Sequence, residues 1–149
     1  MSSRSPQRLS KSDYERLAAF RYQLRRFLRF SELEAEAVGL TPRQYQGLLA
    51  VAGYPGRDAI TIGELAQQLL VAHHSAVGLV DRLSAHGLVE RQPGPQDRRQ
   101  VFVRLTPRGN ALLERLAHAH RAELLKLGPK LSVLLQTLNN SNSDSEPGR

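Results

Sequence analysis

TIGELAQQLLVAHHSAVGLVDRLSAHGLVERQPGPQDRRQVFVRLTPRG, from Thr61 to Gly109, is the stretch that decides the fold. Two short helical patterns come first and are joined by about three residues. Two strand-like runs follow, on either side of a Pro/Gly turn that carries Asp97, Arg98 and Arg99. A helix pair followed by a basic hairpin is typical of units that bind duplex DNA.

Both helices of this stretch carry end signals. Thr61 and Glu64 have the spacing of a capping box, which predicts a helix start. The second helix runs from about His73 to His86 and has no Ser, Thr, Asp or Asn cap at its start. Gly87 suits the left-handed position that ends this helix, with Leu88 as its hydrophobic partner. Its apolar face consists of Ala76, Leu79, Val80 and Leu83.

The hairpin is predicted from residues 88–91 and 101–105, which read as two short strands. In the second run, valine and leucine alternate with Phe102 and Arg104, as in a half-buried strand. The connection over 92–100 contains two prolines and a glycine and is too long for a tight turn. We therefore expect it to project from the body.

A third helix precedes this stretch. Thr41 can cap it, Pro42 suits its first position, and Gln44 completes a second capping box. Tyr45 and Leu49 are among the side chains expected to face a core. Residues 41–108 thus form one compact unit.

The flanking segments are expected to be helical and rich in leucine. One helix covers 12–38, and another begins at Thr106-Pro107. Gly128-Pro129 is expected to break the second helix, and a last short helix follows at 131–138. Amphipathic helices near both chain ends are a common way to build a twofold dimer. We expect disorder in residues 1–11, which are polar and basic, and in the polar tail at residues 139–149.

Composition narrows the class of protein. The 149 residues carry a net charge of +7, which favours a polyanionic partner such as nucleic acid, although solubility alone can explain it. Aromatic residues make up only 5% and Trp is absent, which argues against a base-stacking surface for single strands. The absence of Cys excludes disulfides, thiolate metal sites and thiol redox sensing.

Targeting signals are not evident. No apolar run approaches the roughly 20 residues of a membrane span. We also expect no signal peptide before the first helix. We expect a cytoplasmic protein without membrane contact.

Catalytic and metal sites are not predicted. The sequence has no G-x-S-x-G, no glycine-rich phosphate loop and no H-E-x-x-H. His73-His74 are adjacent and His118 and His120 are two apart, whereas convergence on a helix needs i,i+4 spacing. We therefore expect no enzyme, no cofactor and no bound metal, with His118 and His120 exposed.

The order of these motifs resembles the MarR family (multiple antibiotic resistance regulators) of winged helix-turn-helix transcription factors. The resemblance covers about residues 12–138, and its most specific part runs from Asp97 to Gly109. The matching residues are Gly39-Leu40-Thr41-Pro42-x-x-Tyr45, Leu65-Ala66, Val80-Asp81-Arg82-Leu83, Gly87-Leu88-Val89-x-Arg91 and Asp97-Arg98-Arg99-x-x-x-Val103-x-Leu105-Thr106-x-x-Gly109.

The resemblance implies a mainly α fold with a small β-hairpin: a winged helix-turn-helix domain flanked by N- and C-terminal dimerisation helices. It implies a homodimer with a recognition helix in each major groove. It also implies that Asp97 orients Arg99 into the minor groove, with Arg98 nearby. A narrow minor groove concentrates negative electrostatic potential, which attracts the positively charged guanidinium of an arginine.

The DNA-contacting residues implied for the recognition helix are His73, His74, Ser75, Val77, Gly78 and Arg82, with Thr61 at the DNA backbone. Gly78 stands where many relatives have Arg, so it either permits close backbone approach or offers no contact. Arg82 suits a phosphate. His73 is equally well explained as a buried structural histidine. The other polar residues of this helix are alternatively explained as an ordinary face exposed to solvent.

The resemblance also implies a small aromatic or phenolic anion as effector. The residues expected to line its pocket are Phe20, Leu24, Arg26, Phe27, Tyr45 and Leu49, with Arg26 as the anion partner. The alternative is that these side chains fill a core.

The predicted function is a dimeric, sequence-specific regulator of double-stranded DNA, with repression as the expected action. Its operator is expected to be a pseudo-palindrome with half-site centres about one helical turn apart. Two alternatives stay open: a non-catalytic winged-helix adaptor that binds protein, and a metal-responsive regulator that uses its histidines.

Overall fold

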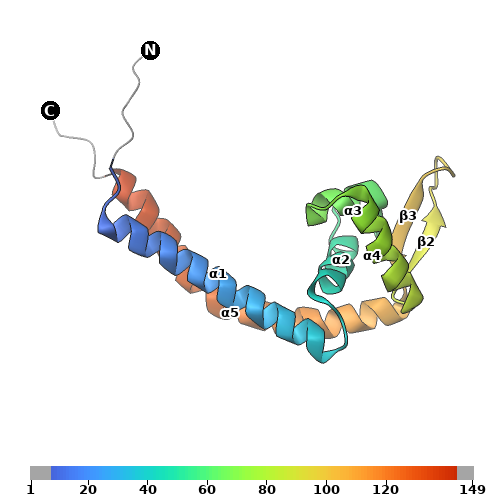
Figure 1. The fold of residues 1–149 in the computed structure, drawn as a ribbon, viewed down its shortest axis with the longest axis horizontal. Coiled ribbons are helices and arrows are strands. Elements are labelled where there is room, and N and C mark those ends of the chain that lie inside the picture. The colour runs from blue at the N-terminus through green and yellow to red at the C-terminus, as the bar shows by residue number, and fades with distance from the viewer. Residues whose placement is uncertain (1–7, 144–149) are drawn as a thin grey trace, which may run out of the picture. The chain divides into compact units, whose positions relative to one another are not determined.

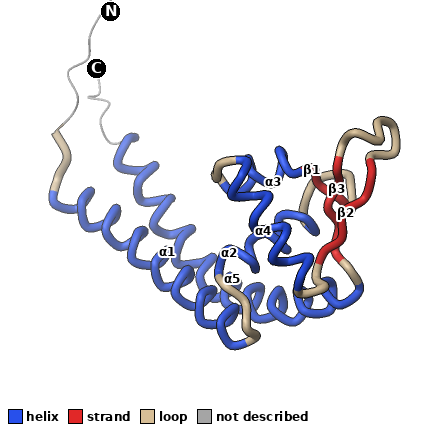
Figure 2. The backbone as a smooth tube through the Cα atoms, turned by 45° about the vertical axis from the view of Figure 1, so that its right-hand side comes forward, coloured by secondary structure: helices blue, strands red, loops and turns tan. Residues whose placement is uncertain are grey.

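The computed structural model describes residues 8–143, which form two compact units. The terminal unit comprises residues 8–30 and 121–143, and the central unit comprises residues 31–120. The elements, labelled in Figure 1 except for β1, which Figure 2 labels, follow in chain order: α1 (Lys11–Ala37), α2 (Pro42–Ala52), β1 (Ala59–Thr61), α3 (Ile62–Leu69), α4 (His73–Ala85), β2 (Val89–Pro93), β3 (Val101–Leu105) and α5 (Pro107–Ser143).

The sheet of the central unit has three antiparallel strands in the order β1-β3-β2 (Figure 2). Val103 of β3 lies opposite Ile60 of β1 on one side and Arg91 of β2 on the other. The predicted hairpin corresponds to β2 and β3, but the sequence analysis missed β1. This strand is only three residues long, too short for a recognisable alternation.

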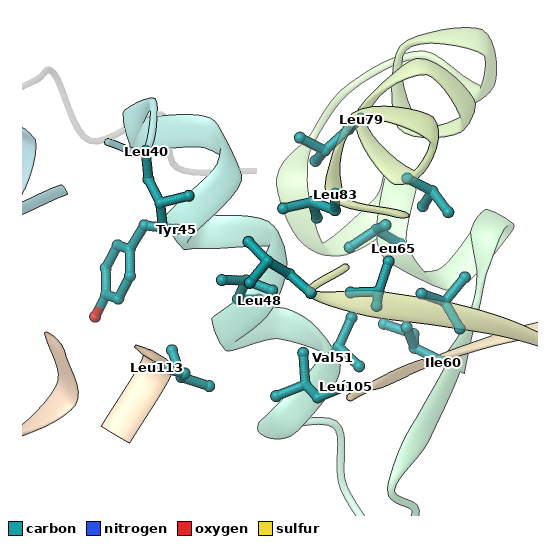
Figure 3. Close-up of a cluster of buried hydrophobic side chains, with 14 of the residues drawn as sticks. Leu40, Tyr45, Leu48, Val51, Ile60, Leu65, Leu79, Leu83, Leu105 and Leu113 are labelled. Carbon is teal, nitrogen blue, oxygen red and sulfur yellow. The ribbon is translucent and has the colours of Figure 1, made fainter. Parts of the chain in front are cut away.

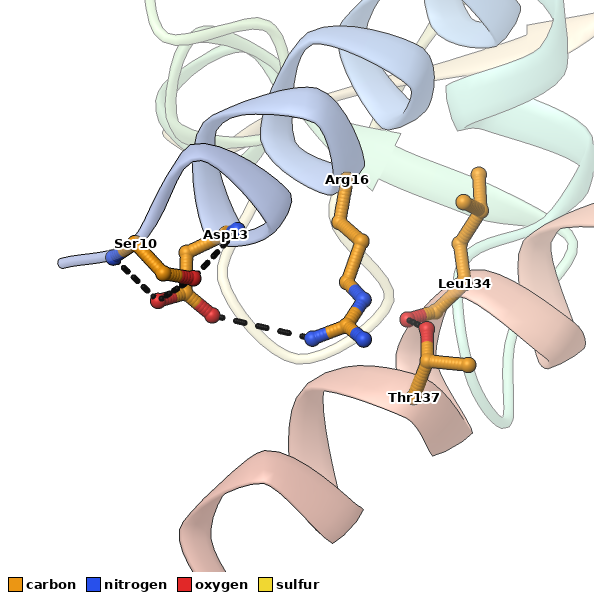
Figure 4. Close-up of polar contacts among 5 residues, drawn as sticks. All are labelled: Ser10, Asp13, Arg16, Leu134 and Thr137. Carbon is orange, nitrogen blue, oxygen red and sulfur yellow. Dashed lines mark hydrogen bonds and ion pairs between the residues drawn. The ribbon is translucent and has the colours of Figure 1, made fainter.

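Local capping explains where three helices begin. Thr41 with Gln44, and Thr61 with Glu64, form complete capping boxes at α2 and α3, as predicted. At α1, the Ser10 amide and hydroxyl both donate to the carboxylate of Asp13, and Asp13 N–H donates back to the Ser10 hydroxyl (Figure 4). The first helix therefore begins at Lys11, slightly before the predicted start.

The core of the central unit lies between α2, α3, α4, the sheet and the first turns of α5, which contribute Leu113 and Leu116 (Figure 3). Gly47 allows α2 to approach α4, because a Cβ there would lie only 3.0 Å from Cδ2 of Leu79. Leu49 was expected to face this core, but 45% of its surface is exposed. The largest fully buried side chains are Leu48, Ile60, Leu65, Leu79, Leu83, Val51, Val80 and Val103.

The predicted position of His120 is also wrong. This residue was expected on the surface, but it is only 4% exposed. Its ring stacks on Tyr45 with 4.4 Å between the ring centroids. One ring nitrogen lies 2.7 Å from the Leu116 carbonyl oxygen and the other 2.8 Å from the Ser31 hydroxyl. His120 is therefore a structural histidine with both nitrogens satisfied, whereas His118 is exposed as expected.

The predicted break at Gly128-Pro129 is wrong. Residues 107–143 form one continuous helix with Pro129 inside it. A proline removes one backbone donor, but leucines continue the helical pattern on both sides of it. The predicted short helix at 131–138 is thus part of α5, which extends to Ser143 into the expected tail. Of the predicted disordered ends, residues 1–7 and 144–149 lie outside the described residues.

Candidate nucleic-acid interface

α4 has one buried and one open face. Ala76, Leu79, Val80 and Leu83 are buried, as predicted. On the other side His73, His74 and Arg82 are exposed, while Ser75, Val77 and Gly78 are half-buried. His73 is therefore not a buried structural histidine. The helix begins after Ala72 without a side-chain cap, in agreement with the sequence.

The loop between β2 and β3 holds Asp97 and Arg99 together. The Asp97 carboxylate accepts hydrogen bonds from the Arg99 backbone N–H at 3.0 Å, from Nε at 3.2 Å and from Nη2 at 3.4 Å. The backbone bond from Arg99, and then its side-chain bonds, lower the pKa of Asp97. The carboxylate is thus charged at neutral pH and orients an Arg99 side chain that is 92% exposed. Arg98 is exposed beside it.

Three predicted contact residues from separate elements meet in one hollow of about 340 Å³ within the central unit. Thr61 comes from the end of β1, His73 from the start of α4, and Arg99 from the loop. Ile62, Gly63, Gln100 and Val101 complete the lining. The Thr61 hydroxyl oxygen accepts the Glu64 N–H and so caps α3, which leaves its O–H as a donor for another partner.

An ion pair between α4 and β2 was not predicted. Arg91 Nη2 lies 2.5 Å from the Asp81 carboxylate. The bond joins α4 to the strand that leads into the loop, although both side chains are partly exposed, so it adds only modestly to the packing between these elements. No sequence pattern predicts this ion pair, because the two residues are ten apart in sequence and lie on different elements.

The start of α3 carries a strongly perturbed carboxylate. Partial burial acts to raise the pKa of Glu64, but hydrogen bonds from Tyr54, Thr61 and Arg57 outweigh it and lower the pKa to about 2. Glu64 therefore stabilises the fold above its usual pKa of 4.5, and this contribution is lost as the pH falls toward 2.

This shift predicts an acid-dependent difference between the wild type and Glu64→Gln. The amide keeps a side chain that suits a capping box but removes the charge. The free energy of unfolding of the wild type should exceed that of the variant near neutral pH, and the difference should shrink between pH 4.5 and about 2. Urea unfolding followed by circular dichroism measures it. A difference that stays constant over this range would contradict the assignment.

Gly78 has room for a side chain, because a Cβ built on it would meet only Arg82 Nη2, at 3.7 Å. Gly78→Ala should therefore stabilise the fold by roughly 0.5–1 kcal/mol through helix propensity. Thermal unfolding measures this gain. If the variant also keeps its affinity for DNA, Gly78 offers no contact; if affinity falls while stability rises, close backbone approach is the reason for the glycine.

The residues predicted for an effector pocket are divided between the two units. Phe20, Leu24, Arg26 and Phe27 lie on α1 in the terminal unit. Arg26 and Phe27 line a hollow of about 200 Å³ there, together with Gln23, Glu123, Lys126, Leu127 and Lys130. In the central unit, Tyr45 is buried and burial raises its pKa, whereas Leu49 lines a different hollow between α2 and α3.

The order α2-β1-α3-α4-β2-β3, with an open helix face and a basic loop between two strands, defines a winged helix-turn-helix unit. From here on, the loop over residues 94–100 is called the wing. The sequence profile of the MarR family matches residues 38–100. The chain belongs to the MarR family.

Several relatives have names that state a function. The HTH-type transcriptional repressor NicR of Pseudomonas putida is 35% identical over 116 residues, which cover 73% of this chain and 71% of NicR. The transcriptional activatory protein BadR of Rhodopseudomonas palustris is 34% identical over 82 residues, covering 55% of this chain and 47% of BadR. The chain spans about half the length of BadR and of YsmB of Bacillus subtilis, which it also matches.

A solved structure of a mutant Escherichia coli MarR complexed with operator DNA has the same fold. Its TM-score is 0.65 with 26% sequence identity, over 85% of this chain and 90% of that one. Among residues 8–143, no helix is long and apolar enough to cross a membrane. No group of three potential metal ligands occurs in that same range.

Proposed function

We propose that the chain is a homodimeric regulator of transcription that binds a specific double-stranded DNA sequence in the cytoplasm and acts as a repressor. The main support for this proposal is the hollow that Thr61, His73 and Arg99 line together. This hollow joins the start of the recognition helix to the wing. The operator complex of the E. coli MarR mutant supports DNA as the ligand, and the name of NicR supports repression. Activation is the second candidate, because BadR is named an activatory protein.

The recognition helix α4 has the chemistry to read a major groove, which is about 12 Å wide and admits one helix. His74 and Ser75 are placed near its start, where side chains reach base edges. Val77 can offer an apolar contact to a thymine methyl group, and Arg82 a charge to a phosphate. Arg99, extended from the wing, suits the negative potential of a narrow minor groove.

The terminal unit supports assembly into a dimer. Its helices leave large apolar side chains exposed, from 45% for Leu17 to 64% for Leu125. Water contact by so many apolar groups is unfavourable, and a second copy of the same helices would cover them. The other strongly exposed members are Tyr14, Tyr22, Leu28, Leu124, Val133 and Leu135.

Selection from a random duplex library tests the proposal. The full chain should enrich a pseudo-palindrome whose half-site centres are about one helical turn apart, with two protomers bound per duplex. Enrichment of no sequence would contradict specific DNA binding. A monomer in solution that shifts no duplex would instead favour the protein-binding adaptor, and zinc in chelator-free protein would favour the metal-responsive regulator.

The hollow beside Arg26 is the proposed place of an effector. Three basic side chains, Arg26, Lys126 and Lys130, line it together with Gln23, Glu123 and the apolar Phe27 and Leu127. Lys126 Nζ lies 3.8 Å from a Glu123 carboxylate oxygen, which leaves Arg26 and Lys130 as the main cations for an anion. This combination suits a small aromatic or phenolic anion, with its charge on the cations and its ring on the apolar side chains. Binding of such an anion is proposed to release the repressor from its operator.

Benzoate serves as the probe in calorimetric titration. Arg26→Gln should weaken its binding about tenfold, because one charge-assisted contact is lost. Arg21→Gln is the control, since Arg21 is exposed on the same helix but does not line the hollow. Equal affinities of both variants, or no binding by the wild type, would remove this site from the mechanism.

A further inference from the structure

Arg57, in the loop between α2 and β1, contacts three separate parts of the central unit. Its guanidinium forms an ion pair with Glu64 of α3. The guanidinium carbon lies 4.6 Å from the ring centroid of Tyr54 and 5.3 Å from that of Phe102. Both distances are within the range of a cation–π interaction, so this single side chain joins its own loop to α3 and to β3.

Phe102 is the residue through which these contacts reach the wing. It follows the wing closely in β3, opposite Thr61 of β1 and Gln92 of β2. A Cβ built on Gly94 would lie 3.2 Å from Cε2 of Phe102. The phenyl ring therefore packs directly against the backbone at the start of the wing.

The wing is held tightly at that point. The Gly94 N–H donates to the Gln100 carbonyl oxygen at 2.8 Å, and the Gln100 N–H donates to the Asp97 carbonyl oxygen at 3.1 Å. The same Gly94 Cβ would come within 2.4 Å of the Asp97 carbonyl oxygen. A shift of the Phe102 ring would thus be transmitted to the turn that carries Asp97 and Arg99.

The ion pair keeps Arg57 in place at neutral pH. Hydrogen bonds from Tyr54, Thr61 and Arg57 outweigh the effect of burial and hold the pKa of Glu64 at about 2, so its carboxylate is charged. The Arg57 side chain is 39% exposed and the Glu64 side chain 20% exposed. A cation–π contact with one exposed ring would stabilise a flexible arginine side chain only weakly. Here the Glu64 carboxylate and two aromatic rings act together to hold the guanidinium in one position.

We infer that Arg57 is a positioning residue for the wing: its contacts with Phe102 and Glu64 hold the start of β3, and with it the Asp97–Arg99 turn, in the orientation that meets the minor groove. The inference rests on the proposed function for its DNA readout. It assigns Arg57 no contact with DNA, so its effect should depend on Arg99.

A double-mutant cycle on the full chain tests this dependence with the selected duplex. Arg57→Ala should weaken binding about two- to five-fold, the size of an exposed cation–π contact. The same substitution should have no further effect in an Arg99→Ala background. Arg57→Lys should restore part of the loss, because an ammonium group can also bind a ring face and pair with Glu64. Arg43→Ala, at an exposed position of α2, controls for loss of charge.

Equal losses in both backgrounds would overturn the inference, because Arg57 would then act on DNA or on the whole fold. Amide hydrogen exchange gives a readout that needs no DNA. Exchange at Gly94 and Gln100 should be faster in Arg57→Ala than in the wild type, while exchange within α2 is unchanged. Unchanged exchange in the wing would also overturn it. If the wild type binds no duplex but the wing amides respond, the proposed function fails and the positioning role stands.

Discussion

Replacing Arg99 by alanine is expected to weaken operator binding tenfold or more, roughly 1.4 kcal/mol or above. The side chain is 92% exposed, and within residues 8–143 its hydrogen bonds and ion pair are made with Asp97, so the folded chain loses one exposed ion pair of little value. The DNA complex loses a cation at the minor groove. The slope of log K against log salt should therefore fall by about one. Fluorescence titration of the selected duplex at several salt concentrations measures both quantities.

Arg98→Ala is the matched control for this experiment. Arg98 is exposed in the same turn, but the hydrogen bonds of the Asp97 carboxylate are made with Arg99. Its loss should lower affinity less, through general charge alone. Thermal unfolding should be the same for both variants. An Arg99→Ala protein that binds as tightly as the wild type, with an unchanged salt slope, would remove the wing from the mechanism.

Gly109→Ala is expected to have the largest effect on stability. A Cβ at this position would lie 2.0 Å from the Leu88 carbonyl oxygen and 3.0 Å from its carbon. This carbonyl cannot move freely, because it accepts the Thr106 N–H at 3.0 Å. The Thr106 hydroxyl also donates to the Gly87 carbonyl at 2.6 Å and accepts the Gly109 N–H at 3.0 Å. We expect a loss of about 3 kcal/mol, at the upper end for overpacking.

Gly63→Ala is the control for this prediction, because it lies in the same unit and nothing approaches its Cβ position within 4 Å. It should leave stability unchanged or slightly improved. The stabilities of both variants are compared by urea unfolding, and the midpoint of the transition should be lower for Gly109→Ala than for Gly63→Ala. Equal midpoints would show that α5 can move away from Leu88 without loss, contrary to the packing described.

The features that sequence predicted well are local ones. The boxes of Thr41 with Gln44 and of Thr61 with Glu64 lie within one helical turn, and both form as expected. Gly87 has the left-handed φ of +70° that its position after α4 required. The pairing of Asp97 with Arg99, which the resemblance to the MarR family implied, also forms between close neighbours, whereas its role at DNA stays a prediction.

The features that sequence missed depend on distant partners. His120 was expected on the surface, but Ser31 and Tyr45, far away in sequence, give its ring a buried site. Arg57 had no predicted role, because its partners Glu64 and Phe102 come from elements that only the fold brings together. The continuity of α5 through Pro129 was missed for a different, local reason, because the apolar helical pattern continues on both sides of the proline.

Binding of the full chain to the selected duplex, compared with a scrambled duplex of equal length, tests the central claim most directly. Equilibrium titration at physiological salt should show two protomers on the selected duplex and an affinity at least about 10³-fold higher than for the scrambled one. Scrambling a single half-site should remove much of this preference, because each protomer reads one half-site. Equal affinity for the selected and scrambled duplexes would contradict sequence-specific regulation by this chain.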